Sequence, residues 1–466
     1  MTTEGGRGSP RLARSRVRAL DGLRGVAVAA VVAFHLPLGI STHAWLPGGW
    51  LGVDAFFTLS GYLITSLLLS ELRGTQAPSL HRFWRRRIRR LQPAALVCIT
   101  VTVVAMRWAR ARTLSTVRGD ALASVTQVAN WYFLWANRPY VGVFNHLWSL
   151  AVEEQFYVIW SLTFLAAVTI AHRFGRDPRI AVFVLGVVTM IASWCLLAYY
   201  PLPRGYFGTD ARLGEILLGG VLACALPLGT SGEITTRSQR LVVVLGGVCA
   251  FGVLALWLLV EWPPRVSLAL LLPMHALCTA AVILAAILVP SRGISRVLGS
   301  GPLVALGRVS YGVYLWHWPV IFVLTPEWLG LGAIPTGIVR VLTTLGLTAT
   351  SWFLVERPIL DDRALQRTRL VYPVGALATV LVVYVSTAAI EPLPPRARGE
   401  SLSLDRTIQA PTRVRDQLGA TRRSPATRSN GPQTPTLHAR SPTQLRRVHG
   451  SEGSNRNPSR KNQWKR

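Results

Sequence analysis

Long apolar runs separated by short polar connections are the main pattern along this chain. Roughly eleven runs are long enough for a helix to cross a hydrocarbon core of about 30 Å. The pattern predicts an all-α polytopic membrane protein with about ten core transmembrane helices and an eleventh near its end. The runs lie near residues 20–40, 50–72, 92–106, 147–171, 180–199, 211–228, 241–260, 266–289, 302–324, 334–355 and 370–390.

The charge of the chain lies outside these runs. Apolar residues make up 50% of the 466 positions, yet the formal net charge is +29, so neither a soluble fold nor a simple apolar anchor fits. Arginines cluster at every second connection, which predicts a multi-pass protein of the cell membrane with a cytoplasmic N-terminus and an extracytoplasmic C-terminal tail. The connection at 107–146 disagrees, because it is assigned to the outside and holds five arginines. The first run contains Asp21 and Arg24 and lacks a cleavage site, so we expect no cleavable signal peptide.

The composition changes at residue 391. Beyond it, Arg, Ser, Pro, Thr, Gly and Asn dominate, and 16 basic residues outnumber 5 acidic ones, which is typical of disorder. This tail is either a solvated linker or a segment that binds anionic surfaces or polymers. The five cysteines lie in apolar runs without C-x-x-C spacing, so we expect no metal site. The expected parts are a basic cytoplasmic head at 1–17, a membrane domain at 18–360, a linker with the eleventh helix at 361–390, and the disordered basic tail at 391–466.

The first apolar run carries three ionisable side chains, Asp21, Arg24 and His35. On a helix, positions 24 and 35 return to within about 20° of each other, and Asp21 lies close to the same stripe. His35 would stand about 16 Å above Arg24, near mid-membrane, where ionisable groups usually face a cavity or the bundle interior. His35 therefore either makes a hydrogen bond between helices or acts as a general base or transient acyl carrier. In the second case Arg24 and Asp21 would organise an anionic ligand.

The second run, WLGVDAFFTLSGYLI, places Asp54 at its outer end and Ser60 further in. TLSGY is not the G-x-S-x-G elbow of a serine hydrolase. The Ser60-Gly61 pair therefore either packs helices together or borders an acyl or substrate channel beside Phe56 and Phe57.

The stretch HRFWRRRIRR follows this run and is denser in arginine than orientation requires. Interpreted as a loop, it either binds lipid headgroups or holds a diphosphate-containing donor such as coenzyme A through bidentate contacts. Nucleic acid is disfavoured, because the cluster adjoins a membrane span. The arginines expected to bind the donor are Arg24, Arg85, Arg86, Arg89 and Arg90.

Four later segments carry further polar residues within apolar runs. In NHLWSLAVEEQFY, His146, Glu153 and Tyr157 share a helical face beside Glu154, as a buried polar network or as groups that orient a histidine or bind a sugar hydroxyl. Glu356 and Arg357 could pair locally or meet the arginine loop. The other candidates are Asp210, Arg212 and Glu215 at the start of the sixth run, and Ser310, Tyr314 and His317 on one face of the ninth.

Six of these segments, in order over residues 18–360, resemble the integral-membrane acyltransferase-3 family, whose members O-acylate polysaccharides, peptidoglycan, lipopolysaccharide and some small molecules. They are RALDGLRG with ten residues between Arg24 and His35, VDAFFTLSGYLI, FWRRRIRRLQP, HLWSLAVEEQFY, TDARLGEILLGG and SYGVYLWHWP. The resemblance implies about ten core spans, a cytoplasmic acyl-CoA donor, an acceptor on the opposite face, and an essential Arg24–His35 pair. Some members carry an outer hydrolase-like domain after an eleventh span. This sequence has the basic tail there without a G-D-S stretch, so we expect the membrane domain or a separate extracytoplasmic transferase to finish the transfer.

The sequence thus predicts a membrane O-acyltransferase that moves an acyl group, acetyl above others, from acyl-CoA to a hydroxyl of an extracytoplasmic glycan or glycosylated metabolite. The expected partners are membrane lipid and the glycan acceptor, without metal or nucleic acid. The alternative is a transporter or flippase in which buried His, Glu and Asp relay protons. A third possibility is a membrane scaffold that presents the tail. His35 and Arg24 are the expected catalytic residues, and the supporting ones are Asp21, Asp54, Ser60, His146, Glu153, Glu154, Asp210, Arg212, Tyr314 and His317.

Overall fold

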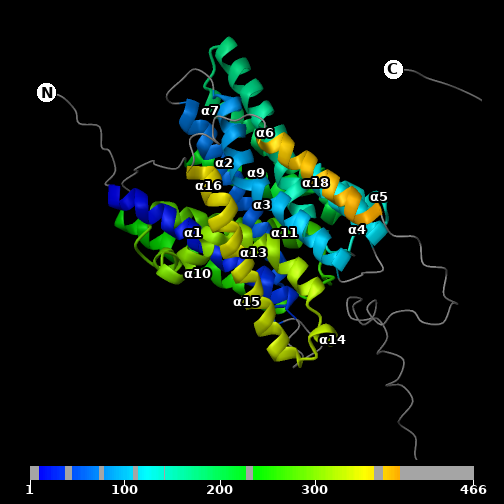
Figure 1. Ribbon diagram of the computed structural model, residues 1–466. Coiled ribbons are helices and arrows are strands. Elements are labelled where there is room, and N and C mark those ends of the chain that lie inside the picture. The colour runs from blue at the N-terminus through cyan, green and yellow to red at the C-terminus, as the bar shows by residue number, and fades with distance from the viewer. Residues whose placement is uncertain are drawn as a thin grey trace, which may run out of the picture. The chain divides into compact units, whose positions relative to one another are not determined.

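The computed structural model describes residues 10–36, 45–72, 78–108, 114–140, 142–226, 235–361 and 371–388. All of them belong to the first of two compact units, which spans residues 1–403. Over these ranges the secondary structure is entirely helical (Figure 1). The tail predicted at 391–466 lies outside the described residues.

The helices follow the predicted apolar runs closely. In chain order they are α1 (Pro10–His35), η1 (Gly49–Leu51), α2 (Gly52–Leu72), α3 (Leu80–Trp108), α4 (Leu114–Val125), α5 (Ala129–Trp135), η2 (Asn145–Leu147), α6 (Trp148–Arg173), α7 (Pro178–Tyr199), α8 (Arg204–Phe207), α9 (Thr209–Ala225), α10 (Thr236–Leu259), α11 (Leu268–Leu288), α12 (Ile294–Leu298), α13 (Gly301–Val323), α14 (Pro326–Leu329), α15 (Ala333–Ser351), η3 (Trp352–Glu356), α16 (Arg357–Asp361) and α18 (Val371–Ala388).

Seven helical segments of the described chain are long and apolar enough to cross a membrane. They coincide with α2, α3, α6, α7, α10, α11 and α15 with its continuation to Asp361. The other predicted runs also form helices, namely α1, α9, α13 and α18, but fall short of these limits of length or apolarity. For example, α9 has 17 residues. The chain is therefore a multi-pass helical membrane protein, and the count of ten or eleven crossings stays a prediction.

The interpretation of the arginine-rich stretch as a loop was wrong. It forms the first half of α3, which continues without a break through the apolar run that follows it. Arginine and leucine are good helix formers, and Phe83 provides a buried anchor in the first turns. A helix restricts which arginines face inward, so this correction changes the donor-binding set.

Close helix pairs bring the polar ends of the apolar runs together without large side chains between them. α1 packs along α13, and α2 packs along α9 (Figure 1). A Cβ on Gly307 would stand 1.7 Å from the Asp21 carbonyl oxygen, and one on Gly61 would stand 1.7 Å from the Ile216 carbonyl oxygen. Only glycine permits such an approach between backbones. The Ser60-Gly61 pair therefore does pack helices, through its glycine.

Candidate active site

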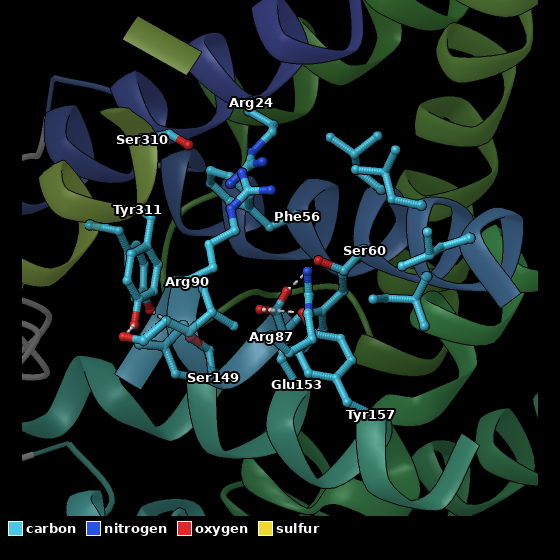
Figure 2. A pocket seen from close by; sticks show the side chains of 18 of the residues that line it. Arg24, Phe56, Ser60, Arg87, Arg90, Ser149, Glu153, Tyr157, Ser310 and Tyr311 are labelled. Atoms are coloured by element: carbon cyan, nitrogen blue, oxygen red, sulfur yellow. Dashed lines mark hydrogen bonds between the residues drawn. The ribbon is translucent and has the colours of Figure 1, made fainter. Parts of the chain in front are cut away.

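A cavity of about 370 Å³ lies between α1, α2, α3, α6 and α13 (Figure 2). One wall is apolar and comes mainly from α2, with Val53, Leu59, Leu63 and Leu67 among its side chains. The volume is in the range of small-molecule sites in proteins. The polar side chains that line it are Arg24, Ser60, Ser66, Ser70, Arg87, Arg90, Ser149, Glu153, Tyr157, Ser310, Tyr311 and Tyr314.

Glu153 is the carboxylate of this cavity. Its Oε1 accepts a hydrogen bond from the Ser60 hydroxyl at 2.8 Å, and its Oε2 accepts one from the Tyr157 hydroxyl at 3.2 Å. Ser149, Glu153 and Tyr157 follow each other at intervals of four residues, so they share the inner face of α6. Both oxygens of Glu153 are thereby held in place on the cavity wall (Figure 2).

Three guanidinium groups share the cavity with this single carboxylate. Arg24 enters from α1, and Arg87 and Arg90 enter from α3 (Figure 2). The guanidinium of Arg87 lies 4.0 Å from the centre of the Tyr157 ring, and its buried Nε has no hydrogen-bond partner among the described residues. The lining is therefore positively charged overall. Such arginines suit an anionic ligand, above all a phosphate that can take two hydrogen bonds from one guanidinium.

The helical form of α3 decides which arginines reach the cavity. Arg87 and Arg90 follow the buried Phe83 at helical spacing, four and seven residues on, and line the cavity. Arg85, Arg86 and Arg89 are not among the lining residues, and Arg86 pairs with Glu71 instead. Arg87 was not among the arginines expected to bind the donor, although the 83-87-90 spacing indicates it once the stretch is a helix.

Three histidines meet beyond one end of this cavity. His35 is the last residue of α1, and Leu36 after it is not helical. Residues 37–40 of the predicted run lie outside the described residues. Its Nδ1 lies 3.3 Å from Nε2 of His317 on α13. The His317 ring centre is in turn 5.7 Å from that of His146 in η2. Residues 35, 146 and 317, far apart in sequence, thus form one cluster, named the histidine cluster below.

Proline chemistry explains the placement of His146. Pro319 lies inside α13 and has no N–H, so the carbonyl of Leu315 lacks its usual helical donor. Nε2 of His146 lies 3.1 Å from this carbonyl oxygen and Sγ of Cys98 lies 3.4 Å from it. The freed carbonyl therefore ties η2 and α3 to α13 at the histidine cluster.

Tyr314 stands between the cavity and the histidine cluster. It lines the cavity, and its ring centre lies 5.4 Å from that of His317 and 5.8 Å from that of His146. Its hydroxyl lies 2.6 Å from Ser149 Oγ and donates to the His146 carbonyl at 2.8 Å. His35 itself is not a lining residue of the cavity. The cavity and the histidine cluster are therefore neighbours that share one tyrosine.

Asp54 and Arg212 form a separate buried cluster. Both are fully buried and paired, and the Arg212 guanidinium also lies 3.6 Å from Glu215. It donates to the Tyr206 carbonyl at 2.9 Å and is surrounded by the rings of Phe57, Trp148 and Tyr206. Neither Asp54 nor Arg212 lines the cavity. Phe57 does line it, and its ring centre lies 5.2 Å from the Arg212 guanidinium.

The remaining predicted residues lie around these centres. Asp210 pairs with Arg204 at 2.7 Å and so does not join the Asp54 cluster. Glu154 lines a much smaller cavity on the other side of Glu153. Glu356 accepts a hydrogen bond from Ser351, and Arg357 pairs with Asp361, so Arg357 pairs locally. The buried hydroxyl of Ser310 faces the main cavity without a partner among the described residues.

The sequence of this chain is similar to a known protein family and to several named proteins. The family model described as "Acyltransferase domain" matches residues 17–388. The peptidoglycan O-acetyltransferase OatA of Listeria monocytogenes is 35% identical over 362 residues, which are 75% of this chain and 56% of that protein. O-acetyltransferase OatA of Staphylococcus aureus is 36% identical over 362 residues, covering 73% of this chain and 56% of that protein.

The putative peptidoglycan O-acetyltransferase YrhL of Bacillus subtilis is 36% identical over 354 residues, which are 73% of this chain and 54% of that protein. The chain thus spans about half the length of the curated relatives it matches. No solved structure gives a significant match. With the family model covering most of its length, the chain belongs to the acyltransferase family of enzymes whose members include these membrane O-acetyltransferases.

Proposed function

We propose that this protein is a membrane O-acyltransferase that moves an acetyl group from acetyl-CoA, bound from the cytoplasm, to a hydroxyl of an extracytoplasmic glycan. One observation carries the proposal. α1 connects Arg24 in a positively charged cavity to His35 in the histidine cluster, and Tyr314 adjoins both places. The names of the relatives, which include peptidoglycan O-acetyltransferases, support a glycan acceptor.

The cavity suits the donor in charge and in lining. Arg24, Arg87 and Arg90 would bind its phosphates, since they outnumber the single carboxylate Glu153. The apolar wall from α2 would take the less polar arm that carries the thioester. Arg85, Arg86 and Arg89 lie outside the cavity lining, so the donor-binding role expected for them passes in part to Arg87.

His35 would drive the transfer. Its imidazole takes the proton of the acceptor hydroxyl while the hydroxyl oxygen forms a bond to the acyl carbon and the bond from that carbon to sulfur breaks. The proton then passes from the imidazole to the leaving thiolate, so the products are the acyl ester and free coenzyme A. In a second route a His35 nitrogen attacks the acyl carbon and the carbon–sulfur bond breaks, so that His35 carries the acyl group. The acceptor hydroxyl then attacks the same carbon, the acyl–nitrogen bond breaks, and the hydroxyl proton ends on the thiolate through the imidazole.

The placement of the other parts follows from this scheme. Glu153 would hold Arg24 and Arg87 on the donor side, together with Ser60 and Tyr157. Residues 18–360 would carry the catalysis, with a cytoplasmic N-terminus and the tail at 391–466 outside. A separate extracytoplasmic transferase could receive the acyl group where the glycan is not the direct acceptor.

Label transfer tests the proposal. Membranes containing wild-type protein, His35→Ala or Arg24→Ala would receive radiolabelled acetyl-CoA, and the glycan and lipid fractions would then be extracted. We expect label in a cell-surface fraction with the wild type and none above background with His35→Ala. His172→Gln, which replaces an exposed histidine at the end of α6, is the matched control and should label as the wild type does. Equal labelling by all variants would refute the proposal and favour a transporter.

A further inference from the structure

The hydrogen bonds of His317 define where its proton lies. Its Nδ1 is 2.6 Å from the carbonyl oxygen of Tyr314. A carbonyl can only accept a hydrogen bond, so Nδ1 must carry the hydrogen. His317 is fully buried on α13, and its ring cannot exchange this contact for water.

The second nitrogen of His317 must then act as an acceptor. A neutral imidazole has one donor and one acceptor nitrogen, and burying a charged ring without a counter-charge is costly. The described neighbours of the two rings are the side chains of Phe34, Tyr314, Trp318 and His146. The backbone carbonyl of Tyr314 also contacts His317, and that of Val31 contacts His35. Nε2 of His317, with its hydrogen on the other nitrogen, therefore presents a lone pair to His35.

Nδ1 of His35 is the atom that faces this lone pair, at 3.3 Å. Two lone pairs would repel at this distance, so His35 Nδ1 carries a hydrogen and donates it to His317. The Nε2 of His35 is then left unprotonated. The hydrogen bond made by one ring nitrogen thus determines the chemistry of the other.

Two aromatic rings keep His35 in this orientation. The Trp318 ring centre lies 4.7 Å from that of His35, and the Phe34 ring centre lies 4.8 Å from it, both in edge contact. Trp318 is itself held by a hydrogen bond from its Nε1 to the Gly142 carbonyl at 2.9 Å. These two contacts restrict rotation of the His35 ring.

We propose that His317 is a positioning residue, which holds His35 in the tautomer with hydrogen on Nδ1 and a lone pair on Nε2, the atom that takes the acceptor proton. This inference rests on the proposed function for its catalytic consequence, but not for its structural content. Removal of the acceptor at position 317 would take away one of the two acceptors near the His35 ring, the other being the Val31 carbonyl, and would raise the share of the other tautomer.

Nitrogen NMR of the full-length protein, labelled with ¹⁵N-histidine in lipid membranes, tests the tautomer directly. The His35 signals are those lost in His35→Gln. In the wild type we expect a protonated Nδ1 and an unprotonated Nε2 for His35. His317→Gln places an amide oxygen near the former Nε2 and should preserve this state, whereas His317→Leu should populate the other tautomer.

The His172→Gln protein is the control, since its exposed histidine touches none of these rings. A wild-type His35 protonated on Nε2 would overturn the inference. So would an unchanged His35 tautomer in His317→Leu, with His317→Gln showing that substitution at this position leaves the fold intact.

Kinetics then separate positioning from a general loss of structure. A wrong tautomer of a catalytic histidine costs about 10²-fold to 10⁴-fold in kcat in general base catalysis. We expect such a loss for His317→Leu, an unchanged KM for acetyl-CoA because the arginines of the cavity are untouched, and substantial rescue in His317→Gln. If the spectra agree but His35→Ala still transfers acetyl groups, the proposed function fails while the tautomer assignment stands.

Discussion

The ratio of arginines to carboxylates differs between two regions of this protein, the Asp54 cluster and the cavity. At the Asp54 cluster, one fully buried guanidinium pairs with two carboxylates and is covered by aromatic rings. At the cavity, three guanidiniums and one carboxylate line about 370 Å³ of open space, and Asp21 and Glu356 act on these arginines from outside the lining. The first arrangement satisfies its arginine from within the protein. The second leaves positive charge for something else to satisfy, so the balance of charge, rather than the presence of arginine, distinguishes a structural cluster from a binding site.

The largest expected effect comes from breaking the satisfied cluster. Arg212→Met would leave Asp54 and Glu215 buried without their cation, and removal of one partner from a buried ion pair costs about 3–5 kcal/mol. We expect a correspondingly lower free energy of unfolding, measured by thermal or denaturant unfolding in detergent. Arg212→Met combined with Asp54→Asn should recover part of it. An unfolding midpoint equal to that of the wild type would refute the structural role.

A third pair, Asp120 with Arg138, lies in the connection outside the predicted spans. Its carboxylate is buried while its guanidinium is partly exposed, so it is intermediate between the Asp54 cluster and the cavity. Burial raises the pKa of Asp120 to about 6, although Arg138 at 3.3 Å opposes the rise. An acid with a raised pKa binds its proton more tightly in the folded state than in the unfolded one, where its pKa is about 3.9. Its contribution to stability is therefore greatest below about pH 4 and is lost as the pH rises to about 6.

We expect the wild type to lose roughly 3 kcal/mol relative to Asp120→Asn over this range, which corresponds to about two pKa units. Unfolding midpoints of both proteins between pH 4 and pH 7 would measure this difference. Parallel curves for the two proteins would contradict the expectation.

Arg87→Gln tests the unsatisfied arginines. A hydrogen bond to a charged group contributes about 1.5–3 kcal/mol, so loss of one phosphate contact should raise the KM for acetyl-CoA about 10-fold to 100-fold. The unfolding midpoint should fall less than in Arg212→Met, because Arg87 lies over the Tyr157 ring and its Nε makes no hydrogen bond within the described residues. Arg82→Gln, on the same helix but exposed, is the matched control. A KM equal to that of the control would place the donor elsewhere.

The smallest effect is expected at the exposed pair of Arg357 and Asp361, which stand 3.4 Å apart with side chains 60% and 71% exposed. Solvent screens such pairs, and they contribute about 0–1 kcal/mol. Arg357→Ala should therefore change the unfolding midpoint by less than the experimental error of that measurement. A large shift of the unfolding midpoint would show that this pair stabilises the fold more than its exposure suggests.

Much of the fold could be predicted from the sequence, because apolar runs of sufficient length leave few alternatives to helices in a membrane. The mistake at HRFWRRRIRR had a physical cause. Charge was treated as evidence for a connection, while the spacing of Phe83, Arg87 and Arg90 was compatible with a helix that extends beyond the apolar region. The runs themselves do not reveal where such an extension begins.

The site was predictable in its members but not in its grouping. Glu153 was expected to orient a histidine or bind a sugar hydroxyl, yet it lines one cavity with the donor-binding residue Arg24. Asp54 pairs with Arg212 and does not line that cavity. The contact between His35 and His317 joins residues 282 positions apart, and no periodicity within one helix contains that information. The free carbonyl of Leu315 could be predicted from the sequence, because Pro319 within a helix cannot donate to the carbonyl four residues before it.

The most direct test of the account measures binding and transfer in one preparation. Purified His35→Ala in lipid would be compared with the wild type for equilibrium binding of acetyl-CoA and for a single turnover of acetyl transfer to a glycan acceptor. The account predicts an unchanged Kd, since the arginine-lined cavity is intact, and no transfer. Transfer at the wild-type rate, or binding lost together with transfer, would contradict a donor site at Arg24 and Arg87 served by chemistry at His35.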